Sequence, residues 1–103
     1  MQINQTPLDI RFYRERSKEA ISLATKGQWQ KAAEANKSLL SRFPKDVETF
    51  NRLGKALSEL GLYAEARIAF QNAKLLLGEW ILERKKRMEY IPNSIKQLRM
   101  ICN

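Results

Sequence analysis

Apolar residues recur at intervals of three and four in the first half of the chain, the spacing that places side chains on one face of an α-helix. The first stripe starts after Thr6-Pro7, where Thr6 can cap a helix and Pro7 needs no N–H in the first turn. It stops at Gly27, which tolerates a left-handed C-cap, and the second stripe stops at Pro44, which cannot continue a helix. The two stripes are Ile10, Tyr13, Ser17, Ala20, Ile21 and Ala24, then Trp29, Ala32, Ala33, Asn36, Leu39, Leu40 and Phe43.

The same spacing continues in the second half of the chain, where Asp46 can open a third helix and Gly61 can close it. A fourth helix is predicted from Tyr63 to Gly78, which we expect to end it. The two stripes are Phe50, Leu53, Gly54, Leu57 and Leu60, then Tyr63, Ala66, Ala69, Phe70, Ala73 and Leu77. Residues 79–91 are also helical in composition, and they either lengthen the fourth helix or form a separate one.

The composition agrees with an all-α chain of one domain. The chain has 103 residues, of which 44% are apolar and 29% charged, as is usual for a globular protein. Gly and Pro are scarce, at 4 and 3 residues, and no run alternates β-branched or aromatic residues around a hairpin turn. We therefore predict an all-α fold in which short turns make neighbouring helices antiparallel.

Two helix-turn-helix segments of the chain match each other at an offset of 34 residues. Gly27-x-Trp29-x-x-Ala32 is echoed by Gly61-x-Tyr63-x-x-Ala66. A helix-turn-helix unit of about 34 residues is the period of the tetratricopeptide repeat. Residues 47–78 resemble that family closely, through Phe50-x-x-Leu53-Gly54-x-x-Leu57, Gly61-x-Tyr63 and Ala66-x-x-x-Phe70-x-x-Ala73.

Residues 13–46 resemble the family more loosely. The positions that match are Gly27, Trp29, Ala32 and Pro44. The resemblance implies one domain over residues 1–103, a right-handed superhelix of antiparallel helix-turn-helix repeats with flanking or capping helices at both ends. Residues 13–46 would be a degenerate first repeat, residues 47–78 a well-matched second one, and residues 79–103 a basic helical extension or cap.

The resemblance also gives packing roles to the matched residues of the second repeat. Gly54 and Ala66 would be small because the two helices of a repeat cross closely there. Tyr63 and Phe70 would be large because they fill the space between that helix pair and its neighbour. We therefore expect all of these residues to lie in the core.

In this family the first helix of each repeat lines a concave groove that holds a partner peptide. The groove residues that the resemblance implies are Arg14, Ser17, Lys18 and Ile21 from the first unit and Glu48, Asn51, Arg52 and Lys55 from the second. Their cations would pair with carboxylates of an acidic or extended partner segment, and Asn51 would hydrogen-bond its backbone. Some members of the family hold the C-terminal carboxylate of chaperones with a clamp of Lys and Asn residues. This chain does not reproduce the clamp, since Ser17 and Ile21 occupy positions where it has Lys and Asn. A solvated basic face is an equally weighted interpretation.

The charge of the chain also favours acidic partners. The formal net charge is +8, with +5 on residues 1–45, none on residues 46–78 and +3 on residues 79–103. Such a balance suits an acidic peptide, a nucleic acid or an anionic surface, and it selects none of them.

The densest basic run, Arg84, Lys85, Lys86 and Arg87, offers an alternative function. These residues could contact nucleic-acid phosphates, while Trp80 and Tyr90 stack on bases. We prefer a simpler interpretation, a solvated helix face with Trp80 and Tyr90 packed against the core. The main hypothesis is therefore a protein-interaction module or scaffold, with nucleic-acid association as the alternative.

Several other functions lack the residues they need. The chain has no His and a single cysteine, Cys102, so it has no pair of cysteines for a disulfide and no cluster for zinc. Without a His base, a Cys–base pair or a Gly-rich phosphate loop, we expect no enzyme activity and no metal or cofactor. The N-terminal residues do not resemble a signal peptide and no apolar stretch could span a membrane, so we expect a cytoplasmic protein.

The stability of so few repeats needs additional burial. Solenoids usually require about three repeats, and only two are recognised here. A last short helix from Ser94 to about Ile101, with Ile95, Leu98 and Met100 on one face, would cap the repeats. A homodimer through the C-terminal segment is a second way to bury apolar surface. The residues that would form it are Trp80, Ile81, Tyr90 and Ile91.

Overall fold

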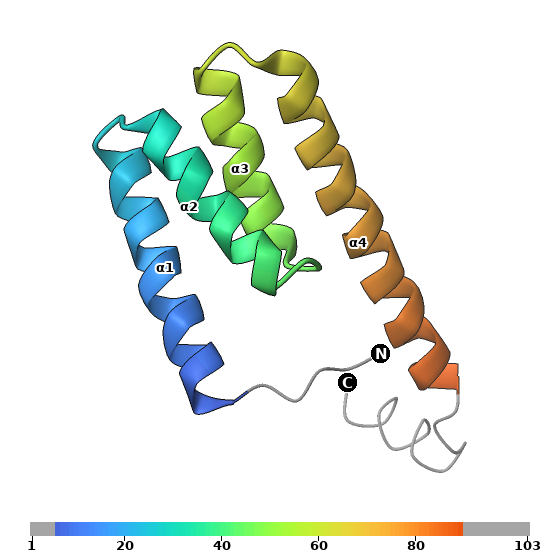
Figure 1. Cartoon of the computed structure of the whole chain (residues 1–103). Coiled ribbons are helices and arrows are strands. Elements are labelled where there is room, and N and C mark those ends of the chain that lie inside the picture. Colours follow the sequence, from blue (N-terminus) through green and yellow to red (C-terminus); the bar gives the residue numbers. More distant parts are fainter. Residues whose placement is uncertain (1–5, 90–103) are drawn as a thin grey trace, which may run out of the picture.

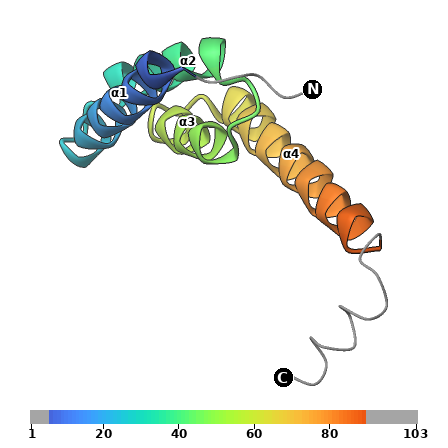
Figure 2. The same cartoon turned by 90° about the horizontal axis from the view of Figure 1, so that it is seen from below.

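The computed structural model describes residues 6–89, and this part of the chain is all-α. Its helices are α1 (Pro7–Thr25), α2 (Trp29–Arg42), α3 (Val47–Glu59) and α4 (Tyr63–Glu89). Each helix runs antiparallel to the one before it and packs against it (Figure 1). In the view from below, α1 and α2 lie together in one layer, and α3 lies outside that layer (Figure 2). The all-α prediction is confirmed.

The predicted helix ends are confirmed at the first three helices. Thr6 caps α1, because the Asp9 amide donates to the Thr6 hydroxyl at 3.1 Å while the Asp9 carboxylate accepts from the Thr6 amide at 3.3 Å. The turns after α1 and α3 contain Gly27 and Gly61, whose φ angles are 75° and 80°. Glycine adopts this left-handed conformation without the clash that a Cβ would cause.

The core consists mostly of alanine. Its central cluster contains Ala32, Ala33, Leu53, Ala56, Leu57, Ala66 and Ala69, from α2, α3 and α4. Small side chains let the helices approach closely, and the predicted close crossing of α3 and α4 is seen at Gly54. A Cβ at Gly54 would lie 2.7 Å from the ring of Phe70.

The expected end of the fourth helix at Gly78 is wrong. The helix α4 continues through Gly78 to Glu89, so residues 79–89 lengthen the fourth helix and do not form a separate one. A glycine inside a helix costs only about 1 kcal/mol, and here good helix formers follow it. Tyr90, Ile91 and the predicted short helix from Ser94 to Ile101 lie outside the described residues.

Several stripe residues that were expected in the core are exposed. Tyr63 is 71% exposed and Phe70 41% exposed. Trp80, expected to pack against the core, is 52% exposed. Within residues 6–89 no helix covers the far side of α4, so large side chains on that side stay in contact with solvent. The other exposed stripe residues are Ile10, Ile21 and Leu77.

Candidate functional site

A polar cluster joins α1 to the start of α3. The Tyr13 hydroxyl donates to Oδ2 of Asp46 at 2.6 Å, and the Thr49 hydroxyl donates to the same oxygen. Nη2 of Arg52 in turn donates to the Thr49 hydroxyl at 3.5 Å. Thr49 is completely buried. Because the Asp46 carboxylate accepts from both Tyr13 and Thr49, it links α1 to α3, two helices that are not consecutive in the sequence.

The apolar stripes do not indicate this cluster, since they place Asp46 only at the start of a helix and Tyr13 only on a helix face. The signal that could have found it is chemical, because a tyrosine on a buried stripe needs a partner for its hydroxyl. Burial raises the pKa of Tyr13, the hydrogen bond to Asp46 and its negative charge raise it further, and the Arg52 cation opposes the change. The phenol therefore remains a hydrogen-bond donor.

Two polar atoms beside the cluster are buried without a partner among residues 6–89. They are Oγ of Ser17, one turn after Tyr13 on α1, and Nε of Arg52 on α3. A buried polar atom that lacks a hydrogen bond costs about 1–3 kcal/mol. Both atoms are closed to solvent in this structure, so their cost falls within the folded protein. Both residues belong to the groove that the sequence predicted, which we call the α1–α3 groove: Arg14, Ser17, Lys18, Ile21, Glu48, Asn51, Arg52 and Lys55.

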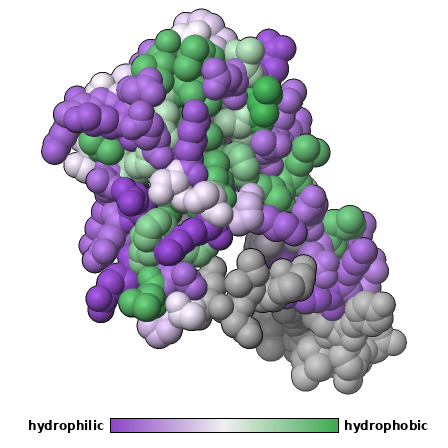
Figure 3. Space-filling model, in the orientation of Figure 1, coloured by the Kyte–Doolittle hydropathy of each residue, from purple (hydrophilic) through white to green (hydrophobic). Residues whose placement is uncertain are grey.

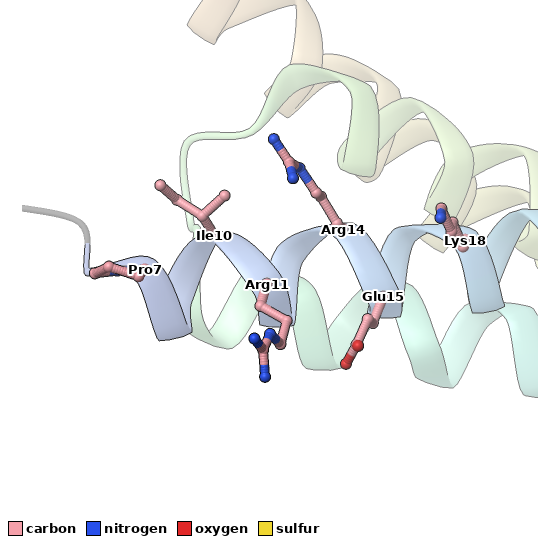
Figure 4. Close-up of a pocket in the computed structure, with 6 residues that line it drawn as sticks. All are labelled: Pro7, Ile10, Arg11, Arg14, Glu15 and Lys18. Carbon is pink, nitrogen blue, oxygen red and sulfur yellow. The ribbon is translucent and has the colours of Figure 1, made fainter.

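The exposed cations of the groove on α1 form no ion pair with the part of the chain that the structure describes. Figure 4 shows a shallow pocket on this helix, where Ile10 and Arg14 project on one side and Arg11 and Glu15 on the other. Arg14 and Lys18 both line the pocket and are exposed. No carboxylate of residues 6–89 forms an ion pair with either of them.

The groove cations on α3 are already paired within their own helix. Nη1 of Arg52 lies 3.5 Å from the Glu48 carboxylate, and Nζ of Lys55 lies 2.9 Å from the Glu59 carboxylate. Lys55 also lies 6.0 Å from the centre of the Trp29 ring. Asn51 is exposed beside them. The unbalanced positive charge of the groove therefore comes from α1.

The basic run near the end of α4 is divided between faces of the helix. The Arg84 guanidinium lies over the Trp80 ring, 5.0 Å from its centre. A shallow hollow is lined by Trp80, Arg84, Arg87 and Met88. Lys85 and Lys86 are exposed as well but do not line it. Of the four basic residues, only Arg84 and Arg87 thus line a hollow together with an aromatic ring.

The comparisons with known proteins leave the family open. No protein-family model matches the chain, and neither a curated protein nor a solved structure is significantly similar to it. Within residues 6–89 no helix is long and apolar enough to cross a membrane, and no three His, Cys, Asp or Glu side chains are grouped as metal ligands. The absence of enzyme activity, metal and cofactor stays a prediction.

Proposed function

We propose that the chain is a cytoplasmic protein-interaction module, related to tetratricopeptide repeats, whose α1–α3 groove binds an acidic, extended segment of a partner protein. The observation that carries the proposal is that the groove cations on α1, Arg14 and Lys18, are exposed and form no ion pair within residues 6–89. An extended acidic peptide supplies carboxylates to such a surface.

The spacing of the two cations suits an extended ligand. Arg14 and Lys18 are one helical turn apart, which corresponds to a rise of about 6 Å along α1. Alternate residues of an extended strand are about 6.6 Å apart and point the same way. A segment with Asp or Glu at every second position would therefore place successive carboxylates at successive cations.

Charge reversal on α1 tests the groove. We expect a fluorescent peptide in which Glu alternates with Ser to bind the protein at low salt. The double variant Arg14→Glu, Lys18→Glu should bind it at least about tenfold more weakly, a loss of about 1.4 kcal/mol, because attraction becomes repulsion. Binding is measured by fluorescence anisotropy.

The matched control reverses the exposed cations of α2 with Lys31→Glu and Lys37→Glu, which changes the net charge equally. This control should retain binding within about twofold. Equal losses in the two variants would show that only overall charge attracts the peptide, and the groove assignment would be wrong.

The second candidate function is nucleic-acid association, and it is favoured by the hollow that joins Trp80 with Arg84 and Arg87. We expect Arg84→Gln, Arg87→Gln to weaken binding of a generic single-stranded RNA more than Lys85→Gln, Lys86→Gln does. Each lost phosphate contact should also reduce the steepness of the salt dependence by about one unit. Absence of RNA binding at low salt would eliminate this alternative.

A further inference from the structure

A second surface of the protein lies open on the side of α4 that faces away from α2. It is a shallow hollow lined by Ser58 of α3 and by α4 residues that include Tyr63, Ala66, Arg67, Phe70 and Lys74. We call this hollow the α4 seat. Tyr63 is 71% and Phe70 41% exposed in it. Figure 3 shows hydrophobic side chains exposed along α4 between hydrophilic ones.

The internal repeat shows what such a hollow accommodates. The residues 34 positions earlier are Ala24, Trp29, Ala32, Ala33, Asn36 and Leu40. In the first helix pair Ala32, Ala33 and Asn36 are at most 2% exposed. Ala32 and Ala33 share a core cluster with Leu53, Ala56 and Leu57 of α3, and Ala24, Trp29 and Leu40 pack against it. The α4 seat is thus the open equivalent of the surface that α3 covers on α2, and its shape suits one more helix.

Residues 90–103 would not reach the seat as one helix folded back along α4. As a continuous helix, residues 90–103 would extend about 21 Å at the rise of 1.5 Å per residue. Phe70 lies nineteen residues before the end of α4, or about 28 Å along its axis, and Tyr63 lies about 39 Å away. A helix folding back along α4 would end before it reached either residue.

The charge of the seat indicates the chemistry of its occupant. Arg67 and Lys74 stand where α2 has Ala33 and Leu40, and no acidic residue lines the seat. Neither cation forms an ion pair with another of residues 6–89. A second copy is poorly suited, because the chain carries a net charge of +8, and residues 90–103 contribute two cations and no carboxylate side chain to it. Like charges across an interface are unfavourable.

We propose that the α4 seat binds an amphipathic helix of a partner protein, with an apolar stripe at i, i+3, i+4 and i+7 and carboxylates beside it. The stripe would pack on the exposed parts of Tyr63 and Phe70, as α3 packs on α2. The carboxylates would pair with Arg67 and Lys74. The seat is separate from the α1–α3 groove, so the chain would join two segments.

The test uses a designed helical peptide with a Leu and Ala stripe flanked by Glu. It should bind the full chain, and the double variant Arg67→Glu, Lys74→Glu should weaken binding at least about tenfold. Tyr63→Ser should weaken it as well, and since Tyr63 is mostly exposed the fold should persist. The groove variant Arg14→Glu, Lys18→Glu should leave binding within about twofold, which separates this proposal from the proposed function.

Three outcomes would overturn the proposal. The first is that the Glu peptide does not bind, or binds no better than the same peptide with Lys in place of Glu. The second is a dimer in sedimentation that Tyr63→Ser dissociates, which would give the seat to a second copy. The third is binding only after Ile95→Glu and Leu98→Glu in the full chain, which would give the seat to residues 90–103.

Discussion

Replacing Gly54 by leucine is expected to lower the free energy of unfolding by about 2–3 kcal/mol, the upper part of the range for overpacked cores. The ring of Phe70 already occupies the place of a side chain at this position, since a Cβ would lie 2.7 Å from it. A leucine would push the ring outward and separate α3 from α4 at their crossing. The alanine-rich core has few large side chains that could adjust.

The matched control is Gly78→Leu on the exposed part of α4. A Cβ there would meet no atom within 4 Å, so leucine adds helix propensity without a clash. Stability should stay unchanged or rise by up to about 1 kcal/mol. Urea unfolding followed by circular dichroism measures both variants.

Restoring space beside position 54 extends this test. In a Phe70→Ala background, Gly54→Leu should cost at least about 1 kcal/mol less than in the wild type, because the leucine then occupies the volume of the missing ring. Equal costs in the two backgrounds would mean that Phe70 is not what requires glycine at this position.

Local chemistry made the helices and most of their ends predictable. Thr6 with Asp9 forms a reciprocal cap, and Gly27 and Gly61 adopt the left-handed conformation that ends a turn. The prediction at Gly78 is wrong because a glycine ends a helix only when the following residues favour another conformation. After Gly78 they favour helix, and α4 continues to Glu89.

The periodicity could not show which stripes are covered. Trp29 of α2 corresponds to Tyr63 of α4 at the 34-residue offset, yet Trp29 is partly buried and Tyr63 is 71% exposed. A stripe indicates which face of a helix is apolar, whereas burial also needs a neighbour on that face. For α2 the neighbour is α3, and within residues 6–89 α4 has none on its far side.

The groove residues were placed by resemblance, but their charge state depends on side-chain contacts. Sequence analysis treated Lys55 as equivalent to Lys18. In the structure Lys55 pairs with Glu59, whereas Lys18 forms no ion pair within residues 6–89 although Glu15 stands one turn before it. Helical spacing makes such pairs possible, and the side-chain conformations decide which of them form.

Tyr13→Phe is expected to lower the free energy of unfolding by about 1–2 kcal/mol near pH 8, because it removes a hydrogen bond to a charged and partly buried acceptor. The loss should also loosen the α1–α3 groove, since this bond ties α1 to the residue before α3. The matched control is Tyr63→Phe. Tyr63 is mostly exposed, and no hydrogen bond of its hydroxyl is found within residues 6–89. That change should cost less than about 0.5 kcal/mol.

The alkaline pH dependence distinguishes the Tyr13 hydrogen bond from a general packing effect. The pKa of Tyr13 in the folded protein is raised above the ordinary value of 10.0, mainly by burial and then by Asp46. Its contribution is therefore complete below pH 10 and is lost as the pH rises through the folded-state pKa, because the unfolded phenol ionises first. Urea unfolding at pH 8 and pH 11 should show the gap between wild type and Tyr13→Phe becoming smaller at the higher pH. Lysine titration affects both proteins alike, so a constant gap would mean that the folded protein does not raise the pKa of Tyr13.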